Sequence, residues 1–510
     1  MSAATQTATR LEDFIRAGRR VKHHSPWARA IVTWETWWQA TRLLSGGQWT
    51  LLSLWAESEQ VHVAVDAGGE IGVLSCVCEN NRFPSVGKSH PPAIRLERAI
   101  RDLWGLEPEG LADTRPWLDH GRWRPRTGVD GLAATRAGGG YAFLPAEGES
   151  LHQIPVGPVH AGIIEPGHFR FTANGEAVVR LEARLGYVHK GIERLMQGAT
   201  LDRASLLAGR ASGDSTVAFA LAFARAVEAA HGMEVPPRAV WLRALMAELE
   251  RLANHFGDIG AVCNDAAFAM MHAQCGHLRE QVLRVANWCF GHRLMMDRVV
   301  PGGVKRDMSG GGHVLIRSLV DEIRHRFPEL VELYDNTASL QDRTVGTGIV
   351  SPQLARQYGC GGYIGRASGR KVDARRAPGY PPYDVLRFEV PVREDGDVDA
   401  RIWVRVLEVD QSLALIDQLL DQLPSGPVDE PLGALSASKG REGMALVEGF
   451  RGDLLAWVRI GTEGTIERCH LRDPSWFQWP LLEAAIEGNI VADFPLCNKS
   501  FNCSYSGHDL

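Results

Sequence analysis

Residues 186–228 read GYVHKGIERLMQGATLDRASLLAGRASGDSTVAFALAFARAVE, and the rest of the chain is best interpreted around this stretch. Its start carries charged and apolar side chains at helical spacing, which predicts a helix over 187–198. A polar, serine-containing turn at 210–215 leads into residues 217–227, which are apolar on every side. Such a segment belongs inside a large core, so we predict a buried helix over 215–230.

The composition is that of an ordinary globular protein. The 510 residues, 45% hydrophobic and 23% charged, allow a large core and roughly two to four domains' worth of chain. A net charge of −6 argues against a nucleic-acid partner. The nine cysteines have no repeated spacing, which suits a reducing compartment, and no apolar run reaches the roughly 18 residues that cross a bilayer. With no signal peptide visible, we expect a cytoplasmic protein that meets a membrane only through partners or its surface.

The chain divides into two predicted domains and a linker. Residues 1–125 combine β-type runs at 61–65 and 71–78 with a helix that starts after two prolines and ends at Gly105. Residues 126–150 are rich in glycine, proline and alanine and are interpreted as a linker. Residues 151–510 are mostly helical after a hairpin turn at Asn174-Gly175, so the predicted class is α+β. Further helices are predicted over 238–260, 264–297, 309–334 and 404–423, with strands and turns over 443–471.

Several motifs carry a resemblance to a known family. The pattern GYxHKGIE, the following RxxGxx turn and the alanine-rich helix are joined by PGGVKRD at 301–307 and VEGFRG at 447–452. Together they resemble the catalytic subunit of energy-converting, membrane-bound [NiFe] hydrogenases and the related 49-kDa quinone-site subunit of complex I, over about residues 156–510. Near the N-terminus, the ER-x-x-x-D-x-x-G pattern at 97–105 resembles the 30-kDa subunit of complex I. The resemblance therefore implies a fusion of the two subunits.

The resemblance also defines where a metal centre would lie. In the hydrogenases, two thiolates of the RxCGxC turn and two of a C-terminal DPCxxCxx[HR] motif hold nickel and iron. Serine hydroxyls have a far higher pKa than thiols and replace them poorly as ligands of these metals. We therefore expect no NiFe centre, and we expect the one remaining cysteine to be a buried small hydrophobic residue. The corresponding positions here are Ser212, Ser215, Cys503 and Ser506. His508, close to the end of the chain, is a candidate metal ligand or proton carrier. The alternative is that His508 and Asp509 are an unstructured terminal pair.

A second implied ligand is a quinone. His160 lies in a Gly-Pro-Val-His turn similar to the GPxHP turn that places a histidine at the quinone head group of complex I. A neutral imidazole can donate a hydrogen bond to a quinone oxygen. The tyrosine of that family's clamp falls on Gly213, so half of the clamp is missing, and Ser212, Gly213 and Ser215 are the other candidate cofactor-binding positions. The alternative is a turn histidine without a function.

Acidic and basic residues suggest proton transfer. In VExxRG of the family, the arginine lies over the metal and the glutamate belongs to a proton path, which implies these roles for Arg451 and Glu448. A buried carboxylate and guanidinium would neutralise each other, so a plain ion pair is equally open. Glu193 and Asp214 are expected to face the same cavity, where the pKa values of neighbouring carboxylates would separate. With His160, these four residues are the catalytic candidates.

A polar line runs along one predicted helix. Glu248, Arg251, Asn254 and His255 follow one another at i, i+3, i+6 and i+7 among leucines, similar to an ExxRxxNH helix of the family. Buried polar side chains are destabilising unless they are satisfied. We therefore favour a structural network that ties helices together over a catalytic role.

Three functional readings remain open. The first is a subunit of a hydrogenase-related or complex I-like oxidoreductase, peripheral to the inner membrane, that couples electron transfer, with a quinone as one acceptor, to an ion-pumping module. The second is a non-catalytic assembly or conformational-coupling subunit, and the third is a C/D-type subunit of an NADH:quinone oxidoreductase. The chain lacks CxxC pairs and a GxGxxG motif, so we expect the iron–sulfur cluster in a small partner subunit, beside antiporter-like membrane partners.

Overall fold

The computed structural model describes residues 10–123, 141–433 and 440–510. It separates into two compact units, residues 1–142 with 357–359 and residues 143–356 with 360–510, which are described separately. Most of the predicted linker lies outside the described residues, and its last ten residues, 141–150, form no helix or strand. Within the described ranges, no helix combines the length and the apolar character that a bilayer span requires.

The first unit is built on a five-stranded sheet in the order β1-β3-β6-β5-β4. Strands β3 and β6 pair in parallel, and the other neighbours are antiparallel. The β-type runs at 61–65 and 71–78 are thereby confirmed as strands. The elements are α1 (Leu11–Ala17), β1 (Arg19–Arg20), β2 (His24–Ser25), β3 (Ala28–Val32), α2 (Trp34–Ser45), β4 (Thr50–Ala56), β5 (Gln60–Asp66), β6 (Ile71–Val77), β7 (Arg82–Pro84), α3 (Ile94–Trp104) and β8 (Glu107–Glu109).

Helix α3 shows how the ER-x-x-x-D-x-x-G pattern works locally. Gly105 ends the helix at φ 69°, a left-handed conformation that favours glycine. The buried Glu97 carboxylate accepts hydrogen bonds from Ser85 Oγ and the Val86 N–H, both at 2.6 Å. Asp102 accepts from three successive backbone N–H groups at 117–119. These carboxylates therefore hold the segments before and after α3 against it.

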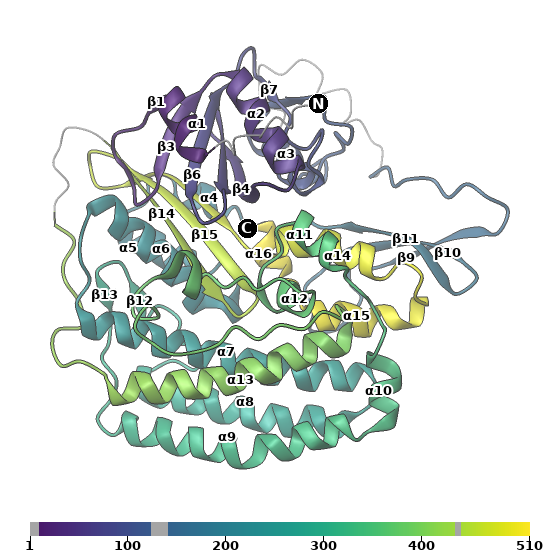
Figure 1. Ribbon diagram of the computed structural model, residues 1–510, viewed down its shortest axis with the longest axis vertical. Coiled ribbons are helices and arrows are strands. Elements are labelled where there is room, and N and C mark those ends of the chain that lie inside the picture. The colour runs from purple at the N-terminus through teal and green to yellow at the C-terminus, as the bar shows by residue number, and fades with distance from the viewer. Residues whose placement is uncertain (1–9, 124–140, 434–439) are drawn as a thin grey trace, which may run out of the picture. The chain divides into compact units, whose positions relative to one another are not determined.

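The second unit contains long helices that run side by side (Figure 1). Helix α6 is alanine-rich and almost wholly buried, as predicted for 215–230. Pro328 lies inside α9, a helix predicted over 309–334. The long helices are α6 (Thr216–His231), α7 (Pro237–Asp265), α8 (Ala269–Phe290), α9 (Gly312–Asp335) and α13 (Val398–Asp421). The shorter ones are α4 (Ile192–Met196), α5 (Leu201–Ala208), α10 (Ala338–Thr344), α11 (Pro352–Gln357), α12 (Gly362–Ala367), α14 (Ser475–Ala485), α15 (Phe494–Phe501) and α16 (Tyr505–Asp509).

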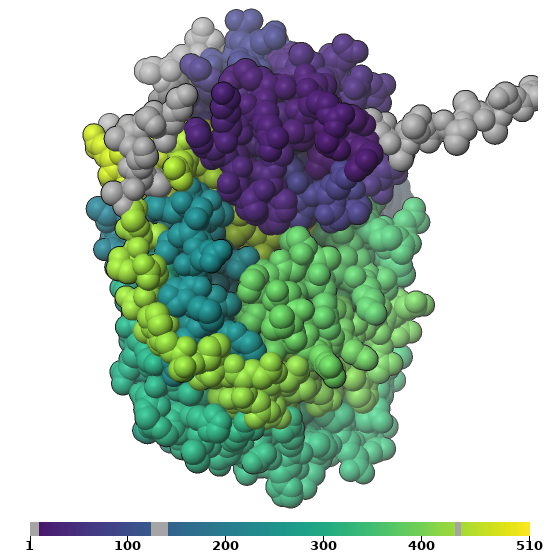
Figure 2. Space-filling model, turned by 60° about the vertical axis from the view of Figure 1, so that its left-hand side comes forward, coloured from purple at the N-terminus to yellow at the C-terminus, as the bar shows by residue number. Residues whose placement is uncertain are grey.

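Antiparallel strands complete the second unit. Strands β14 (Arg441–Gly449), β15 (Gly452–Ile460) and β16 (Ile466–Arg472) pair in sequence order, and β9 (Leu151–Val156), β10 (His168–Asn174) and β11 (Ala177–Arg184) form a second sheet. The β10–β11 hairpin turns at Asn174-Gly175, as predicted. A short pair, β12 (Val299–Val300) and β13 (Gly303–Val304), lies beside residues 422–433, which follow the surface after α13 in yellow-green (Figure 2).

Two predicted helices are too long, because glycines interrupt them. The helix predicted over 264–297 ends at Phe290, where Gly291 adopts φ 77°. Of the helix predicted over 187–198, only α4 forms, since Gly191 interrupts it at φ 71° and Gly186, just before it, has a φ of 91°. Residues 187–191 instead wrap around the C-terminal residues of the chain.

The contact between α6 and β14 depends on a missing side chain. A Cβ added to Gly443 would collide with the backbone of α6 at the Ala226 carbonyl. Both partners are backbone in regular elements, so neither can move without disturbing the core. This glycine lets the sheet approach the buried helix closely.

Gly443→Ala should therefore lower the free energy of unfolding by about 3 kcal/mol, as overpacking does in rigid cores. Gly276→Ala is the matched control, because a Cβ there meets nothing within 4 Å on α8 and alanine favours helix by about 0.5 to 1 kcal/mol. Chemical denaturation of both variants measures the difference. Equal stabilities would contradict the close contact.

Candidate functional site

The turn at 212–215, for which the resemblance implies the positions of the metal ligands, holds an ion pair. Asp214 Oδ1 and Oδ2 accept from Arg451 Nη1 and Nη2 at 2.8 and 2.6 Å, a bidentate pair. Ser212 Oγ donates to Asp214 Oδ1 at 2.8 Å, and Ser215 Oγ donates to the same oxygen at 3.2 Å. Although desolvation by burial opposes ionisation, Arg451 and the two hydroxyls lower the pKa of Asp214 to about 2. The pair is therefore fully charged at neutral pH.

The C-terminal motif meets this turn. Ser504 Oγ and Ser212 Oγ lie 2.9 Å apart, and Arg451 Nε donates to the Asn502 carbonyl at 2.5 Å. Cys503 is buried at 5% exposure, and burial raises the pKa of its thiol, so it is a neutral apolar residue as expected. Ser506 uses its backbone N–H to bind Glu165 Oε2 at 2.9 Å. The two motifs thus come together as the resemblance implies.

These residues do not fit a NiFe centre. The hydroxyls of Ser212 and Ser215 hydrogen-bond to Asp214, and that carboxylate is already bound to the cationic Arg451. The one thiol is held in its protonated form by burial. Nickel and iron in such a centre need several thiolates, which these residues do not supply. Among the described residues, no three His, Cys, Asp or Glu side chains group in a way that could hold a metal ion.

The partners of Glu193 are not the residues that were expected to share a cavity with it. Its carboxylate lies between Arg468 Nη1 at 2.7 Å and His470 Nδ1 at 2.8 Å, and it accepts the Leu471 N–H at 3.0 Å. Burial opposes its ionisation, but Arg468 and His470 outweigh burial and lower the pKa of Glu193 to about 2. The carboxylate therefore fastens α4 to β16.

The expectation of an unstructured His508–Asp509 pair is wrong. Both side chains are buried, and the His508 ring stacks on Trp476 with 4.0 Å between ring centroids. Asp509 accepts hydrogen bonds from the backbone N–H groups of Gly186 and Val188. The glycines that interrupt the predicted 187–198 helix therefore shape a cradle for this carboxylate.

His160 has an aromatic partner that the sequence motifs do not contain. Its Nε2 lies 3.3 Å from the hydroxyl of Tyr505, the first residue of α16, and its ring lies 5.4 Å from the ring of Phe169. Partial burial lowers the pKa of His160, so the imidazole is neutral at pH 7. Val159 and Ile163 in the same loop are 83% and 99% exposed. A phenol and an imidazole thus lie together beside an apolar loop.

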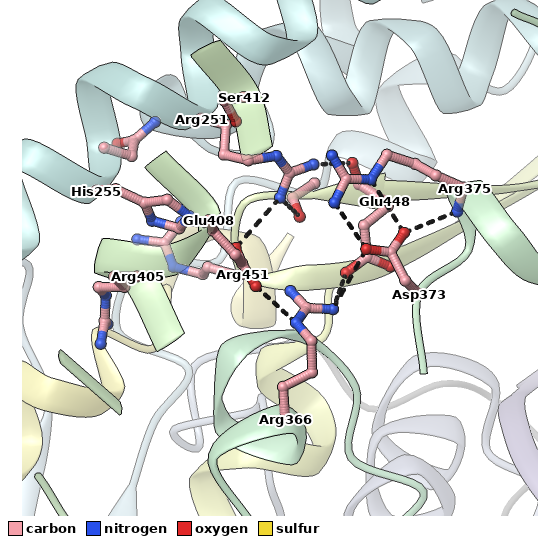
Figure 3. A network of polar contacts seen from close by, with 12 residues as sticks. Arg251, His255, Arg366, Asp373, Arg375, Arg405, Glu408, Ser412, Glu448 and Arg451 are labelled. Atoms are coloured by element: carbon pink, nitrogen blue, oxygen red, sulfur yellow. Dashed lines mark hydrogen bonds and ion pairs between the residues drawn. The ribbon is translucent and has the colours of Figure 1, made fainter. Parts of the chain in front are cut away.

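A network of buried ionised groups occupies the centre of the unit (Figure 3). Arg366 binds Glu408 at 2.6 Å and Glu448 at 2.9 Å, and Arg375 binds Asp373 at 2.7 Å and Glu248 at 3.0 Å. Two of its arginines lie between pairs of carboxylates.

The residues of α7 join this network. Arg251 lies 3.4 Å from Glu248 and 3.9 Å from Glu408, while His255 Nε2 lies 2.7 Å from Glu408. Glu248 also accepts hydrogen bonds from the hydroxyls of Tyr383 and Ser412. The polar line on α7 is therefore part of an interhelical network.

The expected pair between Glu448 and Arg451 is replaced by two separate pairs. Glu448 Oε1 accepts from Arg366 and its Oε2 from the Ala374 N–H at 2.9 Å, while Arg451 binds Asp214. The two residues lie on β14 and the following turn, so their side chains leave in different directions.

The network contains four carboxylates and three guanidinium groups, which favours one additional proton. Burial and the neighbouring Asp373 raise the pKa of Glu448 to about 7, although Arg366 opposes this. Burial lowers the pKa of His255, although the hydrogen bond to Glu408 opposes this shift. Glu448 is therefore the carboxylate of this network whose pKa is raised, whereas the pKa values of Glu248, Asp373 and Glu408 are lowered.

Comparisons with known proteins agree with this architecture. Residues 265–509 match the family described as respiratory-chain NADH dehydrogenase, 49 Kd subunit. Formate hydrogenlyase subunit 5 of Escherichia coli (strain K12) is 32% identical over 438 residues, 84% of this chain and 77% of the relative. NADH-quinone oxidoreductase subunit 4 of Thermus thermophilus is 33% identical over 278 residues, 54% of this chain and 68% of the relative. A chain in the structure of the membrane-bound sulfane sulfur reductase, an archaeal respiratory membrane complex, gives a TM-score of 0.67 at 27% identity and covers 71% of this chain and 99% of that one.

The chain belongs to the superfamily of hydrogenase large subunits and complex I 49-kDa subunits. Within it, the chain is a hydrogenase-related, complex I-like oxidoreductase subunit.

Arg366→Met should lower the free energy of unfolding by about 3 to 5 kcal/mol, because it leaves buried carboxylates unpaired. The matched control is Arg317→Met, whose arginine pairs with Asp421 at the surface and whose loss should change stability by less than about 1 kcal/mol. Urea denaturation at neutral pH compares them. A smaller loss for the buried variant than for the surface variant would contradict the network.

Glu193→Gln should weaken the acid sensitivity of the fold. Because the folded pKa of Glu193 is depressed from 4.5 to about 2, its stabilisation is complete above about pH 4.5 and disappears as the pH falls towards 2. The free energy of unfolding of the variant should therefore fall less over that range. Glu467→Gln, an exposed position on β16, the strand that Glu193 contacts, should retain the full acid dependence of the wild type.

Proposed function

We propose that this chain is a peripheral subunit on the cytoplasmic side of a membrane complex, where it couples electron transfer to an ion-moving membrane module without a NiFe centre. The Arg451–Asp214 pair supports this proposal, since it fills the place of the metals with a charged pair. Relatives named as formate hydrogenlyase and as an archaeal respiratory membrane complex support the membrane assembly. Electrons would come from an iron–sulfur cluster in a small partner subunit.

The observation that carries the redox role is the contact between His160 and Tyr505. The family's tyrosine position is Gly213 here, and Tyr505 supplies a phenol from another element. Burial raises the pKa of Tyr505, so its hydroxyl remains a neutral donor. At 3.3 Å the hydrogen bond between the two side chains is long, and a carbonyl oxygen can compete for either donor. A quinone-type head group with an apolar tail suits this pair and the exposed Val159 and Ile163 beside it.

Proton supply is the second requirement of quinone reduction, which consumes two electrons and two protons. Burial and the neighbouring Asp373 raise the pKa of Glu448 within a network of fixed charges, which supports a proton-storing role. Its proton affinity depends on the charges of Asp373 and Arg366. Movement of a charge in the unit would therefore change the protonation of Glu448.

A non-catalytic coupling subunit is the second candidate function. It is favoured by the mutual satisfaction of Ser212, Asp214, Ser215 and Arg451, which fill the metal position with hydrogen bonds. In that case the charged network would transmit conformational changes between partner subunits without exchanging electrons. The third candidate, a C/D-type subunit of an NADH:quinone oxidoreductase, needs another donor in place of the tyrosine missing at Gly213, and Tyr505 is such a donor.

Tyr505→Phe should raise the KM for a short-chain quinone about three- to tenfold in the purified complex, as expected for one lost hydrogen bond. Reduction of the quinone by an artificial electron donor measures this. His231→Gln at the end of α6 is the control histidine substitution, and His160→Gln should resemble Tyr505→Phe. Wild-type turnover that neither substitution alters would contradict the assigned site.

Elemental analysis of the same complex should find no nickel. Stoichiometric nickel would overturn the proposal of a metal-free subunit. Absence of both nickel and quinone-dependent turnover would leave the non-catalytic coupling role.

A further inference from the structure

A small, partly open pocket lies between α7, α8 and the loop after α8. Its walls are largely apolar, formed by leucine, alanine and valine side chains of the two helices. Four charged side chains also line it: Asp214, Glu250, Arg279 and Arg293. Since Asp214 belongs to the Arg451 pair, the pocket connects that pair with a buried face of α7.

Glu250 is the buried acid of this pocket, at 7% exposure. Its carboxylate accepts the backbone N–H groups of Val217 and Ala218 at 2.7 and 3.1 Å, at the beginning of α6. The turn that contains Asp214 immediately precedes these residues. The charge of Glu250 is therefore joined through backbone hydrogen bonds to the segment that presents Asp214.

Asn254 fixes the two acids relative to each other. Its Nδ2 donates to the Asp214 carbonyl at 2.9 Å and to the Glu250 carbonyl at 2.8 Å. One turn of α7 thus holds the Asp214 turn against the pocket wall. This arrangement keeps both carboxyl groups in the same pocket lining.

The electrostatic environment makes Glu250 responsive to its neighbours. Burial, with a smaller contribution from the charge of Asp214, raises the pKa of Glu250 to about 8, although the two N–H groups and Arg251 act in the opposite direction. Arg279 of α8 and Arg293 of the following loop line the same pocket, and Arg293 is paired with Glu280 at 2.8 Å. Added negative charge at the Asp214 pair favours the protonated form of Glu250, and its removal favours the carboxylate.

We propose that Glu250 takes up a proton from solvent in the α7–α8 pocket when negative charge appears at the Arg451–Asp214 pair, and releases it when that charge leaves. The step forms one O–H bond on the carboxylate, and the proton comes from hydronium in the pocket. The electron stays on the quinone-type acceptor that the proposed function assigns to His160 and Tyr505. Tyr505 follows Ser504, whose hydroxyl lies 2.9 Å from Ser212 Oγ beside Asp214. This inference rests on the proposed electron-transfer function for the origin of the charge, whereas the proton site itself can be tested without turnover.

The competing explanation is that Glu250 is only a permanently ionised cap for α6. Both explanations predict the contacts with Val217 and Ala218. Only the proton-site explanation predicts a titration near neutral pH that depends on Asp214. Infrared spectroscopy separates them, because a protonated carboxyl group has a C=O band that a carboxylate lacks.

The test is an infrared pH titration of the purified complex in which this chain carries ¹³C-labelled glutamate. A protonated glutamate band with a midpoint at about pH 8 should disappear in Glu250→Gln, while Glu448→Gln identifies the separate band of the central network. Asp214→Asn, which leaves the Glu250 side chain intact, should move the midpoint down by about one pH unit. Glu329→Gln, an exposed position on α9 outside the pocket lining, should leave it unchanged.

Absence of a Glu250 band between about pH 6 and pH 9, or a midpoint that Asp214→Asn does not move, would overturn the proposal. If Glu250→Gln does not fold, the labelled wild-type band and its response to Asp214→Asn still decide the question. Nickel or missing quinone turnover would overturn the proposed function without altering this titration. The two proposals therefore fail on different measurements.

Discussion

The contacts of the Arg366 guanidinium are the constraint on which the second unit depends. This fully buried group lies 2.6 Å from Glu408 on α13, 2.9 Å from Glu448 on β14 and 3.7 Å from Asp373. Burying so many charges is unfavourable unless each has a partner, so the helices and the sheet must be placed within about half an ångström of one geometry. The hydrophobic packing of α6 against β14 supplies stability, whereas the ionic network requires a unique arrangement.

The turn at 212–215 is held closed by an ion pair and hydrogen bonds. Ser212 and Ser215 donate to Asp214, and Asp214 binds Arg451. The positive guanidinium and negative carboxylate compensate each other locally. The deeper network, with its excess of carboxylates, is a separate electrostatic system.

Local features could be predicted from the sequence because they depend on neighbouring residues. The alanine-rich α6, the end of α3 and the β10–β11 hairpin follow from composition and turn chemistry. Partner choice could not be predicted, since it joins distant positions: Glu448 binds Arg366, 82 residues away, and Tyr505 contacts His160, 345 residues away. The sequence did not single out Glu250, because its partners lie on α6 and not along its own helix. An acidic residue among the apolar positions of a buried helix is nevertheless a signal of a buried polar contact.

Helix α12 links the two electrostatic systems mechanically. A side chain at Gly362 would collide with the Arg451 carbonyl, so the helix begins in direct backbone contact with the turn that carries the Asp214 partner. Arg366 lies one helical turn further along the same six-residue segment. Because α12 is short and in direct contact with this turn, a displacement of the Arg451 turn would also shift the Arg366 guanidinium. The Arg451–Asp214 pair and the Arg366 network are therefore coupled by steric contact as well as by charge.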